Sequence, residues 1–229
     1  MGDHAKVFPP SASAAWMQCP AYAPGSGSGT HAEFGTLCHD YAEKALKGDL
    51  SLFDTPDAVR VVITEYVTYC LDTITWADKY VIEGRFDIPT TGEFGTCDLA
   101  ALYSENWGDT QVLEVIDLKT GSSHVKADNP QMRLYALGAA HHFQVNDPNT
   151  KILLTIVQRK HKRSHELTLA ELNEWEQEEL SPAVTRRLEV LQLPIEQQYP
   201  LMQHGWGTCF WCENKGTCLG PNYDVIEDF

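Results

Sequence analysis

The stretch QVLEVIDLK at residues 111–119 has the composition of a β-strand that ends in charged residues. Its β-branched residues favour an extended backbone. Further strands are predicted at residues 80–88, 96–103 and 151–158. Turn-forming residues separate the first three strands, so we expect those strands to form a meander.

Helices are predicted on both sides of these strands. They lie at residues 11–20, 33–46, about 57–78, 130–143, and from Thr168 onward, where a capping box opens a helix that continues or restarts at Ser181. This order predicts an α/β fold with a central mixed sheet flanked by helices. We expect one domain over residues 1–229, with its core at about 33–192 and an extension made of segments 11–20 and 205–220.

The charge balance excludes a generally basic nucleic-acid coat protein. The 229 residues include 32 Asp and Glu against 17 Lys and Arg, a net charge of −15. A nucleic-acid enzyme is still allowed, because its groove can be locally basic. There is no apolar run of the ~20 residues that a membrane span needs, and the first residues do not resemble a signal peptide. We therefore expect a cytoplasmic protein without a membrane partner.

Charged side chains gather at the end of strand 111–119. Asp117 and Lys119 are two apart, so they share one face of the sheet, and Asp98 lies in the preceding strand. Carboxylates and a lysine would be costly in an apolar core, but they suit a divalent cation. A solvated strand end is the alternative interpretation. Gln131 and Tyr135, four apart, share a helix face.

Taken in order, these residues resemble the PD-(D/E)XK nuclease superfamily in its RecB-like branch. The resemblance covers about residues 11–220, and the segments WMQCP and IDLKTG…NPQMRLYALGA resemble a phage-encoded subgroup. One departure is Cys97, which precedes Asp98 where the family pattern has proline. The resemblance implies a restriction-endonuclease-like core. The family positions are filled here by His39, Asp98, Asp117, Lys119, Gln131 and Tyr135.

The same resemblance implies a Mg²⁺- or Mn²⁺-dependent deoxyribonuclease, an exonuclease that hydrolyses phosphodiester bonds at DNA ends. One or two ions would be held by His39, Asp98, Asp117 and the backbone carbonyl of Leu118. Lys119 would act on the attacking water, and Gln131 and Tyr135 would orient that lysine or contact the DNA backbone. For Glu83, a ligand role and a simple strand-edge charge both stay open.

Three cysteines lie close together near the C-terminus, as Cys209-x2-Cys212-x5-Cys218, and Cys19 lies near the N-terminus. Four thiols can hold either zinc or a 4Fe–4S cluster, and their spacing does not decide between the two. AddB-type and CRISPR-associated RecB-like nucleases have one cysteine before the nuclease core and three after it, at the same spacing. The resemblance therefore implies a 4Fe–4S cluster that joins the termini.

Basic residues around the predicted site are candidate DNA contacts. The run at 158–163, just after the last predicted strand, is either such a contact or a solvated loop. The candidates are Lys126, Arg133, Arg159, Lys160, Lys162 and Arg163. The aromatic residues Trp206, Phe210 and Trp211 either stack on unpaired bases or pack over the cysteine site.

The expected partner is DNA with single- or double-stranded ends. A second copy of the chain, or a phage recombination or replication protein, is a further candidate partner, and a phage origin would place the protein in the host cytoplasm. Two other functions remain open: a catalytically silent DNA-end-binding subunit, and a zinc-stabilised module that binds proteins.

Overall fold

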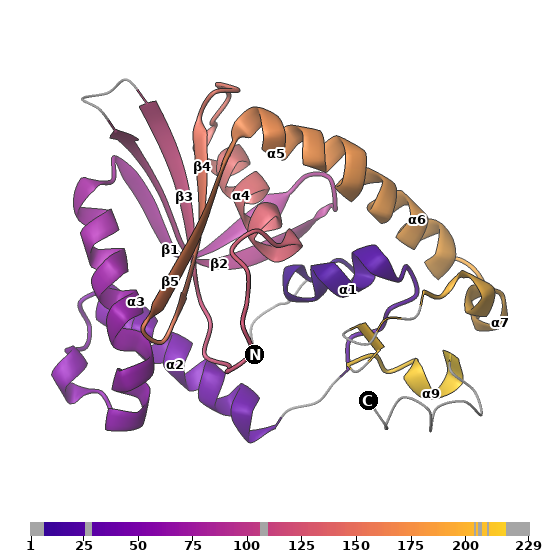
Figure 1. Ribbon diagram of the computed structural model, residues 1–229, viewed down its shortest axis with the longest axis horizontal. Coiled ribbons are helices and arrows are strands. Elements are labelled where there is room, and N and C mark those ends of the chain that lie inside the picture. Colours follow the sequence, from indigo (N-terminus) through magenta and orange to yellow (C-terminus); the bar gives the residue numbers. More distant parts are fainter. Residues whose placement is uncertain are drawn as a thin grey trace.

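The computed structural model describes residues 7–25, 29–105, 110–203, 205, 208–209 and 211–218. At its centre is one five-stranded mixed sheet in the order β1-β2-β3-β4-β5 (Figure 1). All neighbouring strands are antiparallel except β3 and β4, which are parallel. The strands are β1 (Lys79–Ile88), β2 (Glu93–Glu105), β3 (Thr110–Leu118), β4 (Lys151–Gln158) and β5 (His161–Thr168).

Helices cover both faces of the sheet, as the sequence predicted. On one face lie α2 (Thr30–Leu46) and α3 (Asp57–Trp76), and on the other lie α1 (Ser13–Gln18), α4 (Pro130–Phe143), α5 (Leu169–Trp175) and α6 (Ser181–Leu191). The short elements are η1 (Pro10–Ala12), η2 (Leu52–Asp54), the π-helical turn η4 (Glu176–Leu180), α7 (Ile195–Gln198), η5 (Tyr199–Leu201) and α9 (Lys215–Cys218).

Each face of the sheet has its own apolar core. Ile63 and Tyr66 of α3 pack with Leu99 and Ile116 of the sheet. On the opposite face, Met132 of α4 belongs to a second, larger core that includes residues of β2, β3 and β4. The two cores hold α2 and α4 on opposite faces of the same strands.

Local signals explain why α4 begins and ends where it does. The Asn129 side chain accepts a hydrogen bond from the Met132 amide at 3.2 Å, and Pro130 occupies the first turn. The helix ends at Gln144, whose φ of +59° closes it in the left-handed conformation. The predicted bounds, 130–143, are confirmed.

The basic run at 158–163 was predicted to follow the last strand, and this was wrong. Gln158 pairs with His161 across a tight turn, and residues 161–168 form the fifth strand. This strand lies at the sheet edge, and most of its residues are exposed or half-buried. The segment lacks the alternation of apolar and polar residues that indicates a half-buried strand in a sequence. Its strand conformation comes from pairing with β4 and not from burial of its side chains.

None of the helices within the described ranges combines the length and the apolar character that a membrane crossing would require.

Candidate metal centre

Side chains from α2, β1 and β2 meet at one point of the sheet. The ligand atoms of His39, Glu83 and Asp98 all lie within 4.8 Å of one another. Asp117 and Lys119 lie at the end of the adjacent β3. An imidazole and carboxylates gathered in this way provide ligands that suit Mg²⁺ or Mn²⁺.

Two contacts fix the carboxylate of Asp98. The last backbone pair between β2 and β3 is Leu99 with Ile116. Beyond that pair, Asp98 Oδ2 accepts a hydrogen bond from the Leu118 amide at 2.6 Å. Its Oδ1 lies 3.1 Å from His39 Nδ1. The Asp98 carboxylate therefore links β2 to the end of β3 and also contacts the imidazole of His39.

Asp117 contains a buried oxygen without a hydrogen-bond donor. Its side chain is 4% exposed, and Oδ2 lies 2.8 Å from Lys119 Nζ. The two groups form an ion pair by distance, yet their directions are unsuitable for a hydrogen bond, so Oδ2 has no donor among the described residues. Burial raises the pKa of Asp117 to about 6, and the Lys119 charge opposes this shift. A buried carboxylate beside the other ligand atoms is also a candidate cation ligand.

Glu83 is the ligand that the sequence left undecided. It falls opposite Asp98, because Ile82 pairs with Leu99 and Gly84 pairs with Cys97. Its φ of +50° is unusual for glutamate inside a strand. Burial and the Asp98 charge raise the pKa of Glu83 to about 8, against the His39 charge. A strained backbone at a cluster of carboxylates is typical of a functional site.

His39 is positioned by close packing of α2 on the loop that follows β3. A side chain at Gly35 would approach Thr120 Oγ1 to 3.1 Å, so this contact requires glycine or a shift of the threonine. Burial lowers the pKa of His39, but the hydrogen bond with Asp98 and the charges of Asp98, Asp117 and Glu83 raise it to about 9. Without a metal, the imidazole is therefore held as a cation among carboxylates.

A chain of hydrogen bonds extends from Lys119 into α4. Lys119 Nζ donates to Gln131 Oε1 at 2.9 Å, and Gln131 Nε2 donates to the Tyr135 hydroxyl at 2.8 Å. The Tyr135 ring lies against Gly95 of β2, where a Cβ atom would come within 2.8 Å of it. Gln131 therefore contacts the lysine directly, and Tyr135 contacts it through Gln131.

Leu118 was predicted to offer its carbonyl to the metal. The contact found here is made by its amide, which donates to Asp98. Carbonyl coordination stays a prediction.

The predicted DNA contacts fall into two groups. Arg133 pairs with Asp128 at 2.7 Å, Arg163 donates to Gln158 at 3.0 Å, and Lys162 lies 4.0 Å from the Tyr69 ring centre. The remaining three, Lys126, Arg159 and Lys160, are exposed. Because β4 runs parallel to β3, the β4–β5 turn that contains Arg159 and Lys160 emerges at the same sheet end as Lys119.

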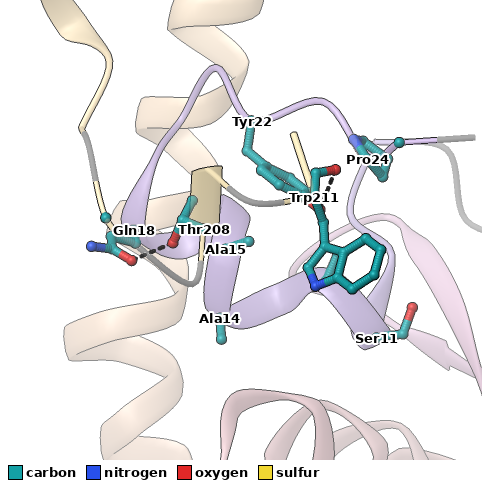
Figure 2. Close-up of a pocket in the computed structure, with 11 residues that line it drawn as sticks. Ser11, Ala14, Ala15, Gln18, Tyr22, Pro24, Thr208 and Trp211 are labelled. Carbon is teal, nitrogen blue, oxygen red and sulfur yellow. Dashed lines mark hydrogen bonds between the residues drawn. The ribbon is translucent and has the colours of Figure 1, made fainter. Parts of the chain in front are cut away.

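The N- and C-terminal segments pair with each other. Pro24 and Cys212 form an antiparallel bridge, the Gly25 amide donates to the Trp211 carbonyl at 2.9 Å, and the Thr208 hydroxyl donates to Gln18 at 2.5 Å. Figure 2 shows Gln18 and Thr208 joined in this way beside α1, with the Trp211 indole over the same helix. Trp211 is 67% exposed. Trp206 and Phe210 lie outside the described residues.

The four predicted cluster cysteines belong to the segments that meet at this junction. Burial raises the pKa of the Cys218 thiol, and the charges of Cys209, Cys19 and Cys212 raise it further. The other three cysteines are therefore close enough to Cys218 to influence its charge. However, within the described segments no three of their sulfur atoms lie within 4.8 Å of one another. Tetrahedral zinc would bring the sulfur atoms to about 3.8 Å, given Zn–S bonds of about 2.3 Å.

A family model described as protein of unknown function (DUF2800) matches residues 4–222. The chain belongs to the DUF2800 family. The matched region contains the whole cluster around Asp98 and Asp117, as well as the four cysteines at both ends of the fold. In this DUF2800 protein, the candidate metal centre and the junction of the termini therefore both lie within the matched region.

Proposed function

We propose that this protein is a metal-dependent deoxyribonuclease that cleaves at DNA ends. The observation that carries the proposal is the group of His39, Glu83 and Asp98, whose ligand atoms lie within 4.8 Å of one another beside the buried Asp117–Lys119 ion pair. Such a group of ligand atoms can hold a divalent cation. A metal-dependent nuclease needs that cation.

The metal ligands would be His39, Glu83, Asp98 and Asp117, with the Leu118 carbonyl as a further candidate. A bound Mg²⁺ or Mn²⁺ supplies Lewis-acid stabilisation of the charge that develops on a phosphodiester. The ligand set contains three carboxylates and one imidazole, so Mn²⁺, which accepts both oxygen and nitrogen ligands, fits at least as well as Mg²⁺.

Lys119 is the group that would act on the attacking water. Asp117 and Gln131 hold its ammonium group from two sides, at 2.8 and 2.9 Å. Held in this way, Nζ can orient a water molecule by hydrogen bonding and can stabilise negative charge on the phosphate. Gln131 and Tyr135 are positioning residues, because their hydrogen bonds reach the water only through Lys119.

The DNA backbone would approach from the sheet end where β3 and β4 finish. Arg159 and Lys160 of the β4–β5 turn are exposed there, on an otherwise strongly acidic protein. Local positive charge at this end would bring phosphates to the metal centre. The preference for DNA ends rests on the resemblance to RecB-like exonucleases.

The cysteines would hold a 4Fe–4S cluster with a structural role. The segments that contain them meet where Pro24 pairs with Cys212, and the charges of the other three thiols act on Cys218. The preference for a 4Fe–4S cluster over zinc rests on the resemblance to AddB-type and CRISPR-associated RecB-like nucleases. By linking both segments it would stabilise the junction.

The test is a cleavage assay on anaerobically purified protein with end-labelled linear DNA and with closed circular DNA. We expect degradation of the linear DNA with Mn²⁺ and no cleavage with EDTA. Asp117→Asn should abolish cleavage and the Mn²⁺-induced rise in melting temperature, whereas Glu65→Gln, an exposed carboxylate on α3, should alter neither. Binding of DNA ends without cleavage by the wild type would instead indicate a silent end-binding subunit. A colourless zinc protein that ignores DNA would indicate a protein-interaction module.

A further inference from the structure

A second polar site lies further along the sheet from the metal centre, between α3, the end of β2 and the middle of β3. It is a cavity of about 380 Å³ whose walls combine aromatic rings with carboxylates. Its main lining residues are Tyr69, Asp72, Trp76, Tyr103, Glu105 and Glu114. Tyr69 and Trp76 are seven apart in α3, so they lie on one face of that helix. The proposed nuclease function does not use any of these residues.

Glu114 is the unusual member of this pocket. It is 1% exposed, and it accepts hydrogen bonds from the hydroxyls of Tyr69 at 2.8 Å, Tyr103 at 3.1 Å and Thr155 at 2.8 Å. Within the described chain no lysine, arginine or histidine forms an ion pair with it. Buried carboxylates are ordinarily paired with a cation. Here the charge of Lys162 acts on Glu114 from beyond ion-pair distance, so no cation among the described residues contacts the carboxylate.

The aromatic rings add a second, independent attraction for positive charge. A ring face attracts a cation, and a phenol that donates its proton to a carboxylate is richer in electrons. Burial raises the pKa of both Tyr69 and Tyr103, so both phenols remain donors. The chain already shows this attraction, because Lys162 Nζ lies 4.0 Å from the Tyr69 ring centre.

The remaining charges around the pocket also favour a cationic ligand. Lys151 neutralises Glu105 at 2.5 Å, whereas Asp72 is exposed at the pocket and forms no ion pair in the part of the chain that the structure describes. The wall residue Trp76 is 78% exposed, so the pocket is open to a macromolecule. A protein with a net charge of −15 favours basic partners over acidic ones.

We propose that this pocket binds the cationic side chain of an arginine or lysine from a basic partner protein. The cation lies against the rings of Trp76 and the tyrosines and faces the carboxylates of Glu114 and Asp72. The cavity volume suits one such side chain, and the inference is independent of the proposed nuclease activity.

The test uses small probes and the full-length protein. N-acetyl-arginine methylamide and N-acetyl-lysine methylamide are titrated into ¹⁵N-labelled protein, and the amide shifts of Tyr69, Thr73 and Ser104 are followed. N-acetyl-citrulline methylamide, which has the shape of the arginine probe without its charge, is the matched ligand control. Tetramethylammonium reports whether a free organic cation is preferred.

We expect saturable shifts with the charged probes and none with citrulline. Trp76→Ala and Glu114→Gln should each weaken binding by about fivefold or more, whereas Trp211→Ala, another exposed tryptophan, should not change it. The proposal is overturned if citrulline binds as well as arginine, if tetramethylammonium alone binds, or if Trp76→Ala leaves the affinity unchanged. Because Trp76 is exposed, that variant decides the outcome even if Glu114→Gln fails to fold.

Discussion

The side-chain carbonyl of Gln131 accepts a hydrogen bond from the Lys119 ammonium at 2.9 Å. Lys119 directly follows β3, whereas Gln131 belongs to the first turn of α4. A helix on one face of the sheet therefore controls the direction of a lysine at the strand end.

Gln131→Ala should lower the rate of DNA cleavage by about 10- to 100-fold, because loss of this contact misplaces the lysine. Tyr135→Phe should have a smaller effect, since Tyr135 reaches Lys119 only through Gln131. The KM for DNA should change little in both variants. Single-turnover cleavage at saturating DNA measures the rate. Equal losses in the two variants, or a loss in KM alone, would contradict this positioning role.

Glu83→Gly should stabilise the metal-free protein by about 1 kcal/mol, because glycine adopts a φ of +50° without strain. It should also weaken Mn²⁺ binding, because one carboxylate ligand is removed. Gln144→Gly provides a matched control: its φ is +59° at the end of α4, so it should gain stability without losing metal affinity. Urea unfolding and calorimetric titration give the two quantities. A Glu83→Gly protein with unchanged Mn²⁺ affinity would remove Glu83 from the ligand set.

The pH dependence of stability should reveal the buried Glu114. Burial raises the pKa of this carboxyl above its usual value of 4.5, and its three hydroxyl donors reduce the shift. The folded state therefore holds the proton more tightly than the unfolded chain, and stability is lost as the pH rises through the raised pKa. Glu114→Gln cannot titrate, so its stability relative to the wild type should increase as the pH rises above 4.5. Urea unfolding at several pH values measures this difference, and a parallel pH profile for the two proteins would refute it.

Cys212→Ala should lose bound iron and expose the junction of the termini to protease. Cys212 forms a backbone bridge with Pro24, so loss of a cluster bound at its thiol would loosen both segments. Cys70→Ala is the control, because Cys70 is buried in α3, away from the junction. Iron analysis and limited proteolysis followed by mass spectrometry report the two effects. Retention of iron in Cys212→Ala would exclude this residue as a ligand.

Much of the architecture could be predicted from sequence, because its elements have strong local signals. The Asn129-Pro130 start of α4 and the capping box at Thr168 are both found, the latter with the Thr168 and Glu171 hydrogen bonds in place. Strand β5 could not be predicted in this way. Its polar residues obtain their strand conformation from pairing with β4, which is a contact between strands rather than a property of the segment.

The candidate site shows the same limit. The positions of Asp117 and Lys119 followed from strand alternation, and Gln131 and Tyr135 followed from helix spacing. The place of Glu83 depends on the register between β1 and β2, which sets it opposite Asp98. Register across a turn is fixed by three-dimensional pairing, so a single sequence left the role of Glu83 open.

The bridge between Pro24 and Cys212 has a consequence for synthesis on the ribosome. Tyr22 and Trp211, which are hydrogen-bonded at this junction, are separated by 189 positions in the chain. The side chains from His39 to Tyr135 leave the ribosome long before Trp211 is translated, so the sheet and its metal ligands can fold before the junction closes. Newly made protein can therefore pass through a stage in which the sheet is assembled and the two terminal segments are still apart. A cofactor that needs all four cysteines could be taken up only after Cys218 has been translated.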